Sequence, residues 1–178
     1  TPYKHNSDRL SQLLRKNKGY GKFLTKEEIN EICILLYDTL VKSKLPVLDN
    51  IEIIIPVPGK TSTSEFKIRC AVPLATGLAE IIRKRTNRKN CHSYPEILLR
   101  IAETRKRRDN KEQRLESAKN DYDVTEYIKT ANTNIIKDEI VLLIDDISAS
   151  GATLQHCANL LRKYGAKDVI RLCAGKTQ

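Results

Sequence analysis

The spacing of apolar and polar residues predicts alternating strands and helices over most of the chain. Residues 51–58 read Ile-Glu-Ile-Ile-Ile-Pro-Val-Pro, a β-branched run that ends in prolines and indicates a first buried strand. Apolar residues at helical spacing over 71–82 predict a helix after it. Further strands are expected over 96–101, 140–144 and 169–174, with a helix from 154 to 164 that ends at Gly165. This order favours an α/β fold with a mainly parallel central sheet flanked by helices.

A further helix is predicted near the N-terminus. Thr25 and Glu28 have the spacing of a capping box, in which each side chain bonds the other residue's backbone amide. The apolar residues that follow recur on one helical face: Ile29, Ile32, Cys33, Leu36 and Leu40. This face either covers the sheet or supplies a homodimer interface. We therefore expect a helical N-terminal extension over 1–48 and an α/β domain over 49–178.

The segment 141–153 carries the most specific chemistry. An apolar strand leads into two adjacent acids, Asp145 and Asp146, and then into a loop of small and hydroxyl residues at the start of a helix. The loop residues are Ser148, Ala149, Ser150, Gly151, Ala152 and Thr153. Because open α/β sheets bind ligands at the carboxyl ends of their strands, the acids should face a crevice.

The residue types in this segment match the parts of a sugar phosphate. Two adjacent carboxylates can accept hydrogen bonds from a vicinal diol or bind a divalent ion. Gly151 lets the backbone approach a ligand closely, and the N-terminus of the next helix offers N–H groups to a phosphate. The segment therefore predicts that sugar hydroxyls bind at the acids and that a phosphate binds at the loop.

In order, residue type and spacing, this segment resembles the 5-phosphoribosyl-1-pyrophosphate (PRPP) signature of type I phosphoribosyltransferases. The resemblance implies the fold of that family. It also implies that Asp145 and Asp146 are the catalytic acids that bind the ribose hydroxyls, while residues 148–153 bind the 5′-phosphate. Mg²⁺ would be the cofactor, held mainly through PRPP, with direct binding to the two acids as an alternative.

Two other segments fit the pyrophosphate site of that family. Pro58, Gly59 and Lys60 follow the first strand, where family members bind pyrophosphate. A flexible basic loop over about 100–115 would close over the leaving group, which excludes water from the reaction. Its candidate cations are Arg105, Lys106, Arg107 and Arg108. Alternatively, the first segment is an ordinary turn and the second is a solvated basic helix face.

Within this family, residues 51–177 look most similar to the ComF-like group. The matching features are the Pro-Val-Pro strand end, Leu98-Leu99-Arg100, Glu112-Gln-Arg114, Tyr122 and the acid pair. The chain departs from that group because it has no N-terminal four-cysteine zinc module. The resemblance implies a role related to DNA uptake or DNA processing.

The implied reaction is transfer of ribose 5-phosphate from PRPP to a nitrogen acceptor, with release of pyrophosphate. The acceptor, a nucleobase or an amine, is not specified by these residues. Family members often bind it under a hood built from a terminal extension, and residues 1–48 are the candidate for a hood in this chain.

A net charge of +10 keeps a second class of function open. Basic segments over 83–89 and 100–114 would suit nucleic acid, so the protein could instead be a regulatory module that binds PRPP or a nucleotide without catalysis. Tyr94 and Tyr122 flank the second segment and are the candidates for base stacking. A catalytically inactive scaffold with an intact pocket is a third alternative.

The cysteine pattern and the absence of long apolar runs bear on the compartment. Five scattered cysteines without a paired motif argue against a disulfide framework and a zinc knuckle. Neither a leader segment nor an apolar run long enough for a bilayer is visible, so no membrane association is expected. We expect a cytoplasmic protein.

Overall fold

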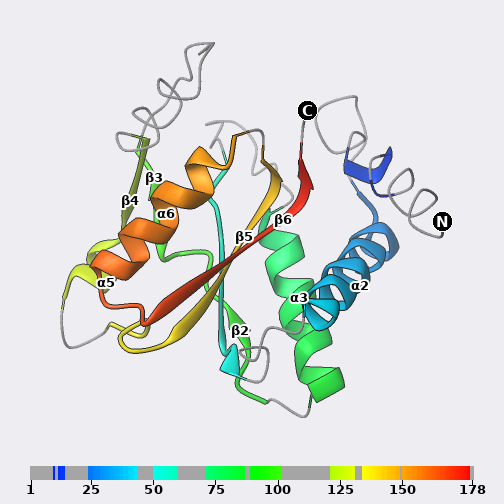
Figure 1. Ribbon diagram of the computed structural model, residues 1–178, viewed down its shortest axis with the longest axis horizontal. Coiled ribbons are helices and arrows are strands. Elements are labelled where there is room, and N and C mark those ends of the chain that lie inside the picture. Colours follow the sequence, from blue (N-terminus) through cyan, green and yellow to red (C-terminus); the bar gives the residue numbers. More distant parts are fainter. Residues whose placement is uncertain are drawn as a thin grey trace.

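A computed structural model shows the arrangement of these elements (Figure 1). The structure describes residues 10, 12–14, 24–43, 50–59, 71–86, 89–101, 121–130, 134–148 and 150–176. The boundary expected near residue 48 stays a prediction, because residues 44–49 lie outside these ranges.

Four parallel strands form the central sheet, in the order β2-β1-β5-β6. They are β1 (Ile53–Pro56), β2 (His92–Ser93), β5 (Ile140–Ser148) and β6 (Asp168–Lys176). Helix α3 (Ala71–Thr86) connects β1 to β2, and α6 (Ala152–Lys163) connects β5 to β6. The predicted α/β fold with a parallel sheet flanked by helices is therefore confirmed.

Each face of the sheet packs against its own hydrophobic core. Side chains along a strand alternate between the two faces, and β5 is apolar on both. Leu142 and Ile144 join a core with α3 and the N-terminal helix α2 (Lys26–Lys42), whereas Val141 and Leu143 join a core with α6. Figure 1 shows α6 on one side of the sheet and α2 with α3 on the other.

Helix α2 begins with the predicted capping box. The Thr25 hydroxyl accepts a bond from the Glu28 amide at 3.2 Å, and the Glu28 carboxylate accepts one from the Thr25 amide at 2.9 Å. Its apolar stripe is buried within the chain, with Ile32, Cys33, Leu36 and Leu40 in the same core as α3. Of the two alternatives for this stripe, coverage of the chain's own core is the one observed.

The strand expected over 96–101 does not belong to the central sheet. Residues Leu98–Arg100 form β3, which pairs antiparallel with β4 (Tyr122–Val124) in a separate two-stranded hairpin, followed by the short helix α5 (Glu126–Lys129). A strand is thus present inside the predicted range, but its expected place in the parallel sheet was wrong. Leu98 is buried while Leu99 is exposed, which is the pattern of a strand covered on one face only. The edge strand beside β1, on the side away from β5, is the two-residue β2.

The expected end of α6 and two of the thiols can also be described. Gly165 takes a φ of 107° after the end of α6, as expected for the glycine that terminates a helix. Cys33 and Cys157 are fully buried, and burial raises the pKa of each thiol to about 12. In the described part of the chain, no helix has the length and apolarity needed to cross a membrane.

Replacing Thr25 with Ala should lower the free energy of unfolding by about 1 kcal/mol, because the Glu28 amide loses its side-chain acceptor. Thr25→Ser is the matched control, since it keeps the hydroxyl and should stay close to wild type. Urea denaturation followed by circular dichroism measures both variants. Equal midpoints for Thr25→Ala and wild type would show that the cap does not stabilise the fold.

Candidate functional site

The acid pair lies where β1 has ended but β5 continues. The ladder between these strands stops at Pro56 and Ile144, and the Val57 amide donates to the Ile144 carbonyl at 2.8 Å. Pro58 has no N–H group to extend the ladder. On the other side of β5, pairing with β6 continues as far as Ser148 and Lys176.

The predicted strand end at residue 144 was therefore too early. Asp145 and Asp146 are inside β5 because β6 is long enough to pair beside them. Both acids nevertheless lie beyond the point at which β1 stops. One side of the acid pair is held by β6, and the other side faces the region beyond the end of β1.

Asp145 lies on the α6 face of β5. By strand alternation it shares this face with Leu143, and its cross-strand partner Cys173 packs against the same core. Burial raises the pKa of the Cys157 thiol on α6, and the nearby negative charge of Asp145 adds to this effect. Both acids are half-buried.

Each acid uses one carboxylate oxygen to hold the backbone of the next residue. The Asp146 amide donates to Asp145 Oδ1 at 2.9 Å, and the Ile147 amide donates to Asp146 Oδ1 at 2.7 Å. Within the ranges that the structure describes, the second oxygen of Asp146 makes no hydrogen bond. The strand thus fixes the orientation of both acids while Asp146 keeps an oxygen for a ligand.

The loop after β5 directs its amides at oxygen atoms. Ser148 Oγ accepts from the Gly151 amide at 2.9 Å, and Ser150 Oγ accepts from the Ala152 amide at 3.3 Å. Gly151 is the N-cap of α6 with a φ of 74°. A side-chain carbon at this position would have Ser148 Oγ as its nearest neighbour, at 4.0 Å. The loop is therefore open at Gly151, so a phosphate could approach its backbone. Ala149 lies outside the described residues.

Cys173 contributes to this site although the sequence pattern did not single it out. It pairs with Asp145 across the β5–β6 ladder, and its Sγ accepts from the Ser148 amide at 3.1 Å. The same sulfur donates to the Gly175 carbonyl at 2.6 Å. The thiol therefore ties the end of β5 to β6. Only the strand register could have revealed this contact, because residues 148 and 173 are far apart in sequence.

The structure places only part of the predicted pyrophosphate set. Pro58 and Gly59 follow β1 and lie next in the chain to the Val57 amide that bonds Ile144, so they are at the same sheet edge as the acids. Lys60, Arg105, Lys106, Arg107 and Arg108 lie outside the described residues.

One of the two tyrosines expected to stack on bases is buried. Tyr122 is 5% exposed and belongs to the core beneath α6, whereas Tyr94 is half-buried. The prediction for Tyr122 was wrong because β4 turns this side chain to the inner face of the hairpin, opposite Arg100. Tyr122 therefore offers no exposed ring to a nucleobase.

Gly151→Ala should destabilise the protein by about 1 kcal/mol, because a Cβ disfavours the left-handed backbone at this position. Gly151→Asn is the matched control, since Asn tolerates this conformation better and should cost less. Thermal unfolding measures both. An Ala variant as stable as wild type would show that the loop is not held in this conformation in solution.

The chain was also compared with known proteins. A family model described as the phosphoribosyl transferase domain matches residues 69–174, which is more than half of the 178 residues. No curated protein matches the chain. The matched region contains the acid pair, the loop, α6 and most of β6. On this match and this fold, the chain belongs to the phosphoribosyl transferase domain family.

Proposed function

We propose that this protein binds PRPP with Mg²⁺ at the carboxyl end of β5 and transfers its ribose 5-phosphate to a nitrogen acceptor. The observation that carries the proposal is the acid pair beyond the end of β1, followed by the hydroxyl and glycine loop at the start of α6. We further place the chain nearest the ComF-like group of the family.

In this proposal, Asp145 and Asp146 accept hydrogen bonds from the two ribose hydroxyls. The bonds from the Asp146 and Ile147 amides set the direction of the carboxylates before the sugar arrives. Residues 148–153 bind the 5′-phosphate, whose oxygens are acceptors of the same kind as the serine hydroxyls that now meet the Gly151 and Ala152 amides.

The residues at this site suit an Mg²⁺ ion that is bound by both the protein and PRPP. Carboxylate oxygens are hard donors that Mg²⁺ accepts, and Asp146 keeps one such oxygen without a hydrogen bond in the described structure. Among the described residues, no group of three or more His, Cys, Asp or Glu side chains could hold a metal ion alone. Mg²⁺ would therefore arrive with PRPP, and when bound it neutralises charge on the pyrophosphate.

The chemical step exchanges one bond at C1′ of the ribose. The bond between C1′ and the pyrophosphate oxygen breaks, and its electron pair leaves with pyrophosphate. The acceptor nitrogen forms the new bond to C1′ and gives its proton to water. Positive charge develops on the ribose, so the carboxylates of Asp145 and Asp146 stabilise the transition state, while Lys60 and a cation from 105–108 would stabilise pyrophosphate.

The double variant Asp145→Asn, Asp146→Asn should weaken binding of Mg²⁺-PRPP at least about tenfold, since each substitution removes a charged acceptor. Calorimetric titration measures this change. Asp168→Asn is the matched control, because Asp168 lies at the start of β6 and pairs with Arg162 instead of facing the site. Unchanged PRPP binding by the double variant, with the fold intact, would remove the site assignment.

An assay of pyrophosphate release distinguishes an enzyme from a non-catalytic module. Wild-type protein that binds PRPP should release pyrophosphate when a panel of nucleobases and amines is supplied with Mg²⁺. Saturable PRPP binding with no release from any acceptor would favour the regulatory alternative.

The net charge supports nucleic-acid binding as a second candidate function, but the end of α3 supports it weakly. Arg83 donates to the Cys91 carbonyl, and Arg85 pairs with Asp38 at 3.3 Å and lies over the Tyr37 ring. Lys84, Arg85 and Lys89 are the exposed cations among the described residues of segment 83–89, and Arg85 is the one engaged by Asp38. Two of the arginines in this segment are thus already bound within the fold.

We therefore expect only non-specific binding to a single-stranded oligonucleotide, with a Kd of roughly 10⁻⁴–10⁻⁶ M that is lost as salt rises. Fluorescence anisotropy between low and physiological salt measures it. The variant Lys84→Gln, Lys89→Gln should reduce this binding and leave PRPP binding unchanged. Tight binding that survives added salt would instead make nucleic acid the main ligand.

A further inference from the structure

Arg100, the last residue of β3, is half-buried, and two of its guanidinium nitrogens are buried without hydrogen-bond partners in the described part of the chain. Its Nε and Nη2 atoms are inaccessible to solvent, and neither has an acceptor there. The contact that the structure does give it is with the Tyr122 ring, whose centroid lies 5.8 Å from the guanidinium carbon.

This arrangement is costly for a ligand-free protein. A buried cation loses its hydration, and a buried N–H group without an acceptor adds a further penalty. The Tyr122 ring offsets part of this loss through a cation–π contact, but it accepts none of the guanidinium's hydrogen bonds in the usual geometry. Buried donors without partners in a native fold call for an explanation, and a missing anionic ligand is the one that fits a guanidinium.

The hairpin holds Arg100 at the ligand-binding end of the sheet. Arg100 pairs with Tyr122, and Leu98 pairs with Val124, so these side chains share the inner face of the hairpin. That face belongs to the core that also contains Val57, just after β1, and Leu154, in the first turn of α6. Arg100 follows Leu98 by two residues toward the end of β3. Figure 1 shows the end of β3 and the start of β4 at the same end of the molecule as the start of α6.

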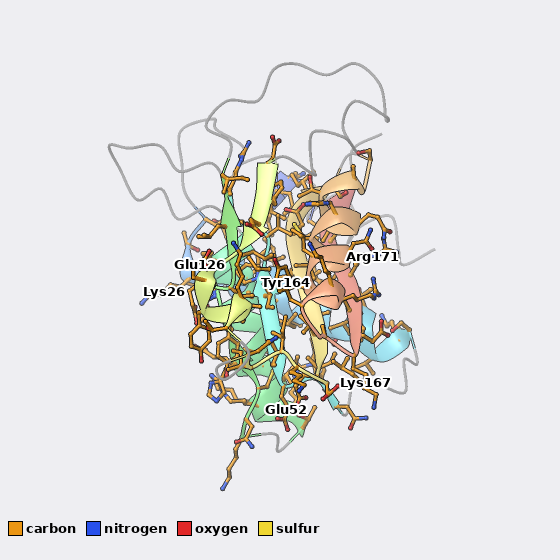
Figure 2. All side chains as sticks on the ribbon, turned by 90° about the vertical axis from the view of Figure 1, so that its left-hand side faces the viewer. Lys26, Glu52, Glu126, Tyr164, Lys167 and Arg171 are labelled. Carbon is orange, nitrogen blue, oxygen red and sulfur yellow. The ribbon has the colours of Figure 1, made fainter. Side chains whose placement is uncertain are left out.

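Figure 2 looks onto this side of the molecule, where the hairpin and α6 lie in front of the sheet. Contacts between α6 and β4 confirm that the two elements are neighbours. An oxyanion bound above β1 and β5 would therefore lie beside the inner face of the hairpin.

We propose that Arg100 binds the pyrophosphate group of PRPP, an inference that rests on the proposed function and names a residue at the start of the predicted basic loop that was not among its candidate cations. Among the described residues at the carboxyl ends of β1, β3 and β5, Arg100 is the only cationic side chain. The 5′-phosphate has the amides of the loop before α6 as donors. Pyrophosphate carries a larger charge than the 5′-phosphate. Of the residues predicted to bind it, the structure describes only Pro58 and Gly59, and neither has a cationic side chain.

The chemistry of arginine suits this position. A guanidinium presents a planar fork of N–H donors that matches two phosphate oxygens at once. Because Tyr122 fixes its plane and the hairpin fixes its backbone, little side-chain freedom remains to be lost on binding. Arg100 would thus stabilise the charge that grows on pyrophosphate as the bond to C1′ breaks.

The test compares three ligands by calorimetry in the presence of Mg²⁺: PRPP, pyrophosphate and ribose 5-phosphate. Arg100→Gln should weaken binding of pyrophosphate and PRPP about tenfold to a hundredfold and leave ribose 5-phosphate unchanged. Arg100→Lys should recover part of the affinity, since it restores the charge without the planar fork. Arg171→Gln is the matched control, because Arg171 is an exposed cation on β6 that bonds Gln155.

A stability measurement separates binding from a structural role. Arg100→Gln breaks no hydrogen bond of Nε or Nη2 in the described structure, so its thermal midpoint should equal or exceed that of wild type. A lower midpoint together with equal weakening of all three ligands would overturn the inference, as would unchanged pyrophosphate binding in a folded variant.

Failure of this inference can be told apart from failure of the proposed function. If wild type binds ribose 5-phosphate in a manner that depends on Asp145 and Asp146 but Arg100→Gln leaves pyrophosphate binding intact, the sugar site stands and the Arg100 assignment is wrong. If pyrophosphate binding depends on Arg100 while ribose 5-phosphate does not bind, the Arg100 assignment stands and the proposed sugar site is wrong. Absence of binding by all three ligands to wild type would reject both.

Discussion

The unequal lengths of the strands that flank β5 are the constraint on which the rest of the structure depends. Pro56 ends β1 at the level of Ile144, and Pro58 prevents its extension, while β6 pairs with β5 for four more residues. Strand β6 consequently lies beside the acid pair on one side, whereas β1 does not reach it on the other. A longer β1 would place a backbone beside the acids, and a shorter β6 would leave them on a loop.

The sequence predicted most of the fold because the relevant signals are local. Thr25 and Glu28 are three residues apart, so the capping box could be identified and its hydrogen bonds are observed. The apolar runs at β1, β5 and β6 contain β-branched residues, and their alternation with helical segments implies a parallel sheet. The run at 96–101 failed as a predictor because composition alone does not distinguish a strand in the main sheet from one in a side hairpin.

The candidate site, like the fold, could be predicted from the sequence only in part. The acid pair and the loop of 148–153 are contiguous, so their residue types alone indicate a sugar phosphate as ligand. The contributions of Cys173 and Arg100 depend on register. Cys173 reaches the Ser148 amide only because β5 and β6 pair as they do, and Arg100 meets Tyr122 only because the hairpin aligns them. Tyr122 was misassigned for the same reason, since the face of a strand that turns inward depends on its partner.

The strand that carries Asp145 and Asp146 is gripped by two cores. Leu143 packs with α6 and the hairpin, whereas Ile144 and Ile147 pack with α2 and α3. Substitutions that repack either core will thus shift this strand, and the carboxylates with it, without altering either acid. In an evolving lineage, the proposed sugar site is adjustable through both cores, so new acceptors can be accommodated there as well as through the residues that touch substrate.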